Sequence, residues 1–298
     1  MLEVKNISKS YDNNKAVSNL SFTVKEGEIF GLLGVNGAGK TTTFRMINNL
    51  LKPDSGEILL DGKKIDYSVT DEIGYLTEER SLLTKMKVKE QIEYYGALKS
   101  IPKDECDKRL DYLLKLLNIS EYKDSYIKEL SKGNQQKIQF ISAIINKPKL
   151  LILDEPFTGL DPYNVELIIK IIKDMTKNGT IIIFSSHRME QVEKFCEKIL
   201  ILVKGNRVLY GNLNEIKKKY LKKSIHVIGD IDVNKIKKID GVNSVSKLET
   251  EYIINIDDIS VSNNVFNAIS DCKDIIKYEV EDPSLNDIFV NLVGDIYE

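Results

Sequence analysis

Short apolar runs alternate with helix-like patterns over the first two-thirds of the chain. Some runs alternate apolar and polar residues, which predicts half-buried strands, and others are continuously apolar, which predicts buried strands. The predicted strands are residues 2–7, 20–24, 29–33, 56–60, 73–76, 150–153 and 180–185. Helical spacing is found at about 39–49, between 88 and 117, in a segment that ends at Pro148, and at 165–177. This alternation predicts an α/β fold with a parallel-sheet core and a helical insertion.

The last quarter of the chain has a different order of elements. Between residues 225 and 280 the pattern indicates strand, helix, strand, strand, helix, strand, and a final helix follows at 284–293. The order βαββαβ is that of a small ferredoxin-like α+β unit. His226, in the first of these strands, is interpreted as a structural residue.

The charge of the chain changes sign near residue 220. The whole chain has a net charge of −2, but residues 224–298 carry 6 basic and 15 acidic residues, whereas residues 1–223 carry 37 and 30. A lysine-rich run at 217–223, most simply a solvated helix end, marks the transition. We therefore expect a first domain at 1–220, with its helical subdomain at about 79–145, and a small accessory domain at 224–298.

Neither a membrane span nor a leader is indicated by the composition. No run of about 18 apolar residues occurs. The first residues lack the basic and apolar regions of a secretory signal. Cys106, Cys196 and Cys272 have no metal-binding or redox spacing, so we expect them to be reduced packing residues. These features predict a cytoplasmic protein.

A glycine-rich loop follows the predicted strand at 29–33. Residues 34–41, Gly-Val-Asn-Gly-Ala-Gly-Lys-Thr, satisfy the pattern G-x-x-x-x-G-K-[ST] between a strand and a helix. Glycines let backbone N–H groups approach phosphate oxygens closely, and the N-terminus of the following helix favours an anion. Lys40 would pair with the β- and γ-phosphates, and the Thr41 hydroxyl would bind Mg²⁺. The loop predicts a nucleotide phosphate site.

Two carboxylates follow the apolar strand at 150–153. A buried strand of a parallel sheet delivers the residues after it to its carboxyl end, where α/β sheets bind ligands. Asp154 is suited to hold Mg²⁺, and Glu155 to act as the general base for the water that attacks the γ-phosphate. Together with the loop, this pair predicts nucleotide hydrolysis.

Residues 130–137, Leu-Ser-Lys-Gly-Asn-Gln-Gln-Lys, resemble the signature segment of the ABC ATPases. Other positions match motifs of that family in the expected order. Tyr11 matches the aromatic residue that stacks on adenine, Glu78 occupies the glutamine-loop position, and His187 matches the switch histidine. Residues 158–161, Thr-Gly-Leu-Asp, match the loop after the acidic strand, although Asp161 could also cap the next helix before Pro162. The resemblance covers residues 1 to about 215.

The resemblance implies a full set of site residues. Glu155 and His187 are assigned to catalysis, and Thr41, Asp154 and Glu78 to Mg²⁺. The residues assigned to ATP are Tyr11, Gly34, Asn36, Gly37, Ala38, Gly39, Lys40, Thr41, Thr42, Ser131, Gly133, Asn134 and Asp161.

Two motifs, the signature and the glutamine loop, depart from the family pattern. Lys132 and Asn134 stand in the signature where glycine and glutamine are usual, and Glu78 stands where an amide is common. A carboxylate is a competent Mg²⁺ ligand, so Glu78 is compatible with hydrolysis. Both departures are similar to those of bacterial export ATPases that include the sodium-extrusion (NatA-type) subunits, and residues 281–289 resemble the end of the small C-terminal domain that many of those proteins carry.

The family resemblance implies a P-loop ABC cassette, with an antiparallel β subdomain and a helical subdomain beside the parallel core, that binds ATP and Mg²⁺. Two such subunits, as a homodimer or a heterodimer, would face head to tail and close over ATP. A separate polytopic membrane subunit would dock on the helical insertion, so the chain would lie on the inner face of the membrane and power transport, with export as the direction.

Two other readings remain open. The first is an ABC ATPase that acts on nucleic acid or ribosomes, but there is no long coiled-coil insertion and no broad basic face, so no nucleic-acid partner is expected. The second is a regulatory ATP-binding module that hydrolyses weakly because of its altered signature and Glu78.

Overall fold

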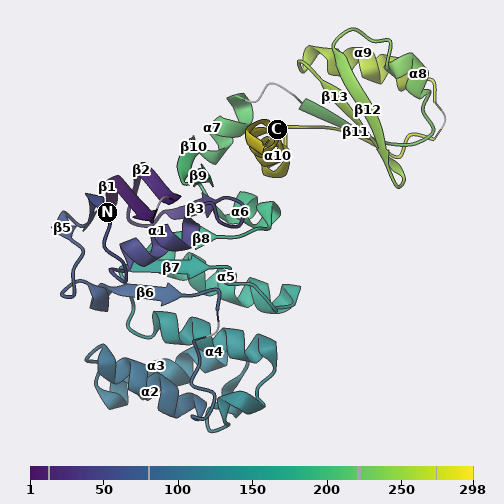
Figure 1. The fold of residues 1–298 in the computed structure, drawn as a ribbon. Helices are drawn as coiled ribbons and strands as arrows, with labels where there is room; N and C mark the ends of the chain where they lie inside the picture. The colour runs from purple at the N-terminus through teal and green to yellow at the C-terminus, as the bar shows by residue number, and fades with distance from the viewer. Residues whose placement is uncertain (13, 80, 220–222, 273, 298) are drawn as a thin grey trace. The chain divides into compact units, whose positions relative to one another are not determined.

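The computed structural model describes residues 1–12, 14–79, 81–219, 223–272 and 274–297. The chain divides into two compact units, Met1–Tyr210 and Gly211–Glu298 (Figure 1). The predicted domain limits of 220 and 224 lie about ten residues further along and stay a prediction. Among the described residues, no helix is both long enough and apolar enough to cross a membrane.

A four-stranded antiparallel sheet begins the first unit. Its order is β2-β1-β4-β5, with β1 at Leu2–Tyr11, β2 at Asn14–Val24, β4 at Ser55–Leu60 and β5 at Lys63–Lys64. The apolar residues of β1 and β2 are buried at alternate positions over much of their length, as the sequence pattern predicts.

A six-stranded sheet forms the centre of this unit. Its order is β10-β9-β3-β8-β7-β6. The strands are β3 (Ile29–Leu33), β6 (Ile73–Leu76), β7 (Leu150–Asp154), β8 (Ile181–Ser185), β9 (Lys198–Val203) and β10 (Asn206–Asn212). The pairs β3–β9, β3–β8, β8–β7 and β7–β6 are all parallel. Four neighbouring strands, β3, β8, β7 and β6, therefore end at one edge of the sheet.

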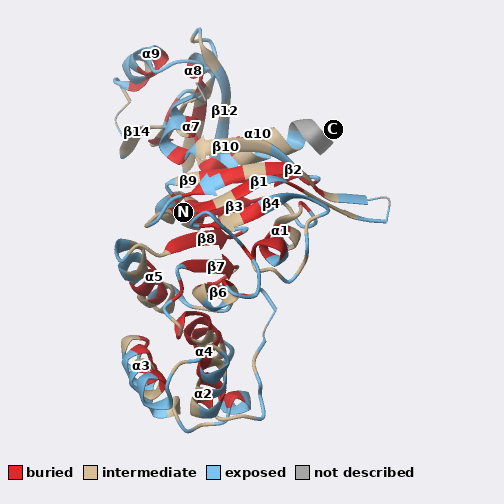
Figure 2. Ribbon diagram, turned by 90° about the vertical axis from the view of Figure 1, so that its left-hand side faces the viewer, coloured by how far each residue is buried: buried red, intermediate tan, exposed pale blue. Residues whose placement is uncertain are grey.

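The main core lies between the two sheets. Helix α1 (Lys40–Ile47) contributes Phe44 to a cluster that joins both sheets, and Phe22 of β2 stacks on Phe30 of β3 with ring centroids 5.0 Å apart. Strands β3, β7 and β8 are buried along their whole length (Figure 2). Helix α5 (Pro162–Lys177) packs apolar residues on β3, β7 and β8, and the short helix α6 (Met189–Phe195) lies beside it. Burial on both faces explains the continuous apolar runs.

The helical insertion contains α2 (Val88–Leu98), α3 (Lys103–Leu116) and α4 (Lys132–Ile144), with 3₁₀ turns at Thr70–Glu72, Ser120–Tyr122 and Ile127–Glu129. The helical pattern predicted at 88–117 is broken between α2 and α3 because Ser100 adopts φ 56° and Pro102 begins the second helix as its N-cap. Helix α4 packs directly on β6, where Gly74 leaves room for the Ala143 carbonyl.

The second unit has the predicted βαββαβ order. After α7 (Leu213–Lys219) come β11 (Lys223–Ile228), α8 (Val233–Ile236), β12 (Val242–Leu248), β13 (Glu251–Ile256), α9 (Ser260–Ile269), β14 (Lys277–Glu281) and α10 (Leu285–Tyr297). The sheet order is β12-β13-β11-β14, all antiparallel. Its core includes Ile225, Val227 and Val265.

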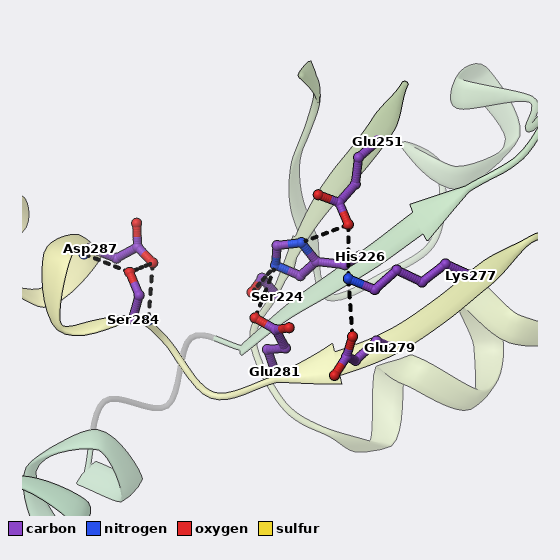
Figure 3. A network of polar contacts seen from close by, with 8 residues as sticks. All are labelled: Ser224, His226, Glu251, Lys277, Glu279, Glu281, Ser284 and Asp287. Atoms are coloured by element: carbon purple, nitrogen blue, oxygen red, sulfur yellow. Dashed lines mark hydrogen bonds and ion pairs between the residues drawn. The ribbon is translucent and has the colours of Figure 1, made fainter. Parts of the chain in front are cut away.

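A polar network lies on β11, β13 and β14 of this unit (Figure 3). His226 Nδ1 lies 3.4 Å from Glu251 Oε1, and Nε2 lies 3.1 Å from Ser224 Oγ and 3.7 Å from Glu281 Oε2. Lys277 Nζ lies 3.1 Å from the same Glu251 oxygen and, with the imidazole, holds the pKa of Glu251 below its ordinary value. Each polar atom of His226 has a partner, which fits its structural interpretation.

The contact between α4 and β6 gives the first testable prediction. A Cβ at Gly74 would lie 2.1 Å from the Ala143 carbonyl oxygen, so Gly74→Ala should separate the two elements and lower the free energy of unfolding by about 2 kcal/mol. Thermal unfolding measures the effect. Gly294→Ala in α10, where none of the described atoms lies within 4 Å of the added methyl, should not lower the melting temperature. Equal stability of Gly74→Ala and the parent chain would contradict the close packing.

Candidate functional site

A cavity of about 690 Å³ opens at the carboxyl edge of the central sheet. Segments after four parallel strands meet there: the glycine-rich loop after β3, His187 after β8, Asp154 and Glu155 at the end of β7, and Glu78 after β6. The lining residues are Ala16, Asn36, Gly37, Ala38, Gly39, Lys40, Thr41, Thr42, Glu78, Asp154, Glu155 and His187.

Neighbouring backbone fixes the shape of the glycine-rich loop. Gly39 has φ 106°, and a Cβ there would lie 2.4 Å from the carbonyl oxygen of Ala16 in β2. A Cβ at Gly34 would lie 2.5 Å from the carbonyl oxygen of Leu202 in β9. Both positions therefore require glycine, and α1 begins immediately afterwards at Lys40. The N-terminus of α1 consequently faces the cavity and favours an anion.

The Lys40 ammonium lies inside the loop. Its Nζ donates to the carbonyl oxygens of Gly34, at 2.7 Å, and Val35, at 3.2 Å. Burial lowers the pKa of Lys40, while the charges of Asp154, Glu155 and Glu78 act in the opposite direction. The cation is thus close enough to three carboxylates to interact with all of them.

Asp154 is the most buried carboxylate of the site, with 2% of its surface exposed. Ser185 Oγ, from the end of β8, donates to Asp154 Oδ1 at 2.5 Å. Burial raises the pKa of Asp154, and the charges of Glu78 and Glu155 add to that effect, whereas the Ser185 hydrogen bond and Lys40 oppose it. The carboxylate is held in place at a cost in free energy.

Glu155 and His187 form a close pair. Glu155 Oε2 lies 2.9 Å from His187 Nδ1; the glutamate side chain is mostly buried, and the imidazole is 71% exposed. Glu155 adopts φ 50°, a left-handed conformation that costs a non-glycine residue of order 1 kcal/mol. Its N–H donates to the Ser185 carbonyl at 3.2 Å, which helps to hold this turn. The turn directs the carboxylate into the cavity beside the imidazole.

The oxygen groups of the cavity fit Mg²⁺. Thr41, Asp154 and Glu78 all line it and supply a hydroxyl and two carboxylates. Mg²⁺ typically takes one or two carboxylates together with substrate phosphates and water, so no dense protein cage is needed. Within the described part of the chain, no cluster of three or more His, Cys, Asp or Glu side chains is arranged to hold a metal by itself.

Other predicted residues lie outside this cavity. Tyr11 ends β1 and is 46% exposed. Ser131 is the N-cap of α4 and accepts from the Asn134 N–H at 3.2 Å. Asp161 caps α5 by accepting from the Asn164 N–H at 2.9 Å, which is the alternative role considered from the sequence. A Cβ at Gly133 would lie 3.3 Å from the Gly159 carbonyl oxygen, so the signature and the loop before Asp161 are adjacent. Arg80, beside the Glu78 loop, is outside the described residues.

Sequence reasoning did not single out several supporting residues. Ala16 contacts the glycine-rich loop from β2, and Ser185 holds Asp154. Gln136 and Gln139 of α4 are 4% and 3% exposed and donate to backbone carbonyls at Pro156 and at Thr77 and Glu79. Two glutamines on the apolar face of a predicted helix indicate buried hydrogen bonds, but the partners of these side chains depend on the tertiary fold.

Comparisons with known proteins identify the family. A family profile described as ABC transporter matches residues 17–158, and a profile for the C-terminal domain of DrrA1-3-like ATP-binding proteins matches residues 211–293. The uncharacterised ABC transporter ATP-binding protein YhaQ of Bacillus subtilis is 45% identical over the whole of both chains. The linearmycin resistance ATP-binding protein LnrL of the same organism is 30% identical over 99% of this chain and 98% of that protein.

A solved structure is similar to the first unit. The dimeric ATP-binding cassette MJ0796, in a post-hydrolysis state bound to ADP and phosphate, has a TM-score of 0.66 and 26% identity, covering 72% of this chain and 99% of that one. The fold predicted from the sequence, a P-loop ABC cassette with a small C-terminal α+β domain, is confirmed. The chain belongs to the ABC transporter family, as an ATP-binding subunit with ATPase activity.

Proposed function

We propose that the chain binds Mg–ATP in this cavity, hydrolyses it in a head-to-tail dimer, and uses the closure of that dimer to power export through a separate membrane subunit. The observation that supports this best is the meeting of Lys40, Asp154, Glu155 and His187 in one cavity from the ends of three neighbouring strands. The signature residues lie outside that cavity, as they must if they complete the site of a second subunit.

The glycine-rich loop holds the phosphates of ATP. Backbone N–H groups of Gly34, Asn36, Gly37, Ala38 and Gly39 and the start of α1 surround the anion, as the left-handed glycines permit. Lys40 leaves the loop carbonyls to pair with the β- and γ-phosphates. The hydroxyls of Thr41 and Thr42 complete the polar lining. Tyr11, exposed at the end of β1, stacks on the adenine.

Glu155 and His187 carry out the chemical step. The Glu155 carboxylate accepts a proton from the attacking water, and His187 orients that carboxylate and contacts the γ-phosphate. Thr41, Asp154 and Glu78 would hold Mg²⁺, which would neutralise negative charge on the phosphates. Ser185 keeps the Asp154 carboxylate oriented for that role.

The second subunit completes the site. Ser131, Gly133 and Asn134 begin α4, and the N-terminus of a helix of 13 residues favours the γ-phosphate presented by the facing subunit. Asp161 lies in the adjacent loop and is exposed, where it reaches the same interface. The dimeric state of the similar cassette MJ0796 supports this arrangement.

The membrane subunit docks on the helical insertion. Leu83, Tyr94 and Leu98 are exposed large apolar residues in the segment that follows the Glu78 loop, and they suit a partner helix. Export is supported by similarity to a protein named for linearmycin resistance. Through its membrane subunit, the chain would lie on the inner face of the membrane. The transported compound contacts the membrane subunit.

Replacing the proposed base tests the dimer. Glu155→Gln keeps the size of the side chain but cannot accept the proton, so ATP should remain bound and the chain should elute as a dimer with Mg–ATP and as a monomer with Mg–ADP. Size-exclusion chromatography with light scattering measures the mass. Phosphate release should fall at least about 100-fold, the lower end of the usual general-base contribution.

Two results would oppose that prediction. A monomer of Glu155→Gln at saturating Mg–ATP would remove the head-to-tail arrangement. Phosphate release at the rate of the parent chain would contradict the role of Glu155 as general base, but not the proposed dimer. The double variant Glu155→Gln with Ser131→Arg, which crowds the signature, serves as the matched control and should not dimerise.

The raised pKa of Asp154 predicts a trade between stability and metal binding. A carboxyl group with a raised pKa in the folded state binds its proton more tightly there than in the unfolded chain. At a pH above the folded pKa, its charged form therefore lowers the free energy of unfolding. This destabilisation disappears as the pH falls toward the ordinary pKa of 3.8. Asp154→Asn should therefore raise the melting temperature of the nucleotide-free chain at neutral pH, by less in acid, and remove the Mg²⁺-dependent part of ATP stabilisation. Differential scanning fluorimetry against pH measures both.

The exposed Asp161 provides the control for this experiment. The backbone N–H of Asn164 lowers the pKa of Asp161, so Asp161→Asn should not raise the melting temperature at neutral pH. A lower melting temperature of Asp154→Asn at neutral pH would show that the Asp154 charge stabilises the empty site.

A further inference from the structure

Gln139 reaches from α4 to the loop that carries Glu78. Its side chain is 3% exposed, and Nε2 donates to the Thr77 carbonyl at 2.9 Å, the Thr77 hydroxyl at 3.2 Å and the Glu79 carbonyl at 3.2 Å. The two carbonyls stand immediately before and after Glu78. One buried amide therefore fixes the backbone on both sides of a residue that lines the phosphate cavity.

The loop is closed by a further bond and anchored by packing. The Thr77 hydroxyl donates to the Glu79 carbonyl at 2.6 Å, so residues 77–79 form a compact turn around Glu78. One helical turn beyond Gln139, the Ala143 carbonyl packs where Gly74 of β6 has no side chain. Helix α4 thus holds both β6 and the loop that follows it.

The arrangement is not the one that stability alone would favour. Gln139 Oε1 is buried and has no hydrogen-bond partner among the described residues. An unpaired buried acceptor destabilises a fold, and an apolar side chain of similar size would remove that cost. The presence of glutamine at position 139 is therefore explained by the hydrogen bonds that its Nε2 donates to the Glu78 loop.

The charge of Glu78 acts on two other groups of the site. It raises the pKa of Asp154 and acts on Lys40, so the position of this carboxylate changes the electrostatics of two other groups that line the cavity. A loop free to move would spread that charge over several positions.

We infer that Gln139 is a positioning residue that holds the Glu78 carboxylate at the phosphate cavity and thereby sets how strongly Mg²⁺ increases the affinity for ATP. The inference rests on the proposed role of Glu78 as a metal ligand. Gln136, also in α4, donates to the carbonyl of Pro156, which follows Glu155. A displacement of this helix would therefore move the backbone beside both Glu78 and Glu155.

The test uses the full chain with Gln139→Met, which keeps the size of the side chain and removes its donor. ATP affinity is measured by equilibrium binding with Mg²⁺ and with EDTA, and the ratio of the two is the Mg²⁺-dependent gain. We expect Gln139→Met to reduce that gain about tenfold, the lower end of the effect of residues that orient metal ligands. Amide exchange at residues 77–79 should become faster, and the melting temperature without nucleotide should not fall.

Three further variants make the outcome specific. Glu78→Gln should reduce the gain, and adding Gln139→Met to it should change nothing more, because both act through one carboxylate. Gln139→Asn, whose donor is one methylene short, should behave like Gln139→Met. Gln91→Met removes another fully buried glutamine, which bonds Leu83 and Ser142, and should lower stability while preserving the gain.

The results separate the inference from the function on which it rests. If Glu78→Gln leaves the gain intact, the proposed metal role of Glu78 fails, and the inference fails with it. If Glu78→Gln reduces the gain but neither Gln139 variant does so, the inference alone is overturned. Additive losses in the double variant would also overturn it, because Gln139 would then act by another route.

Discussion

The parallel pairing of β3, β8, β7 and β6 is the constraint on which the site depends. Parallel strands place their carboxyl ends at one edge, so segments far apart in the chain, from the glycine-rich loop to His187, meet at a single cavity. Strands β3, β7 and β8 are buried on both faces, and their positions are therefore fixed by packing rather than by the site. The carbonyl oxygens of Ala16 in β2 and Leu202 in β9 lie against the glycine-rich loop and restrict its conformation. Chemistry at this edge is thus supported by a rigid core.

The site holds its charged groups at a cost in free energy. Asp154 is buried near two other carboxylates, Lys40 is turned back onto loop carbonyls, and Glu155 adopts a left-handed backbone. A polyphosphate with its metal ion offers partners for these groups, so binding can release part of that cost. Helix α4, which is part of the helical insertion, contacts this site through Gln136 and Gln139. The same helix begins with the signature, so one rigid element connects the two surfaces that the proposed dimer would use.

The sequence predicted the parts of the site that depend on local order. The glycine-rich loop and the Asp154–Glu155 pair follow apolar strands directly, and both line the cavity as expected. The break at Pro102 was not resolved within the long helical pattern, because apolar spacing continues across it. The cap that Asp161 forms on α5 is a local bond and was among the roles considered from the sequence. The reach of Gln139 depends on tertiary contacts that spacing does not encode. The boundary between the units was placed from charge, whereas the structure divides the chain by packing.

The most direct test of the account is the affinity of Lys40→Ala for ATP, measured by isothermal titration calorimetry with Mg²⁺ present. The Lys40 ammonium is the positive side chain inside the loop, close to the three carboxylates that would otherwise repel the γ-phosphate. The account predicts that binding becomes undetectable while the variant remains folded by circular dichroism. ATP affinity equal to that of the parent chain would contradict the assignment of this cavity as the nucleotide site.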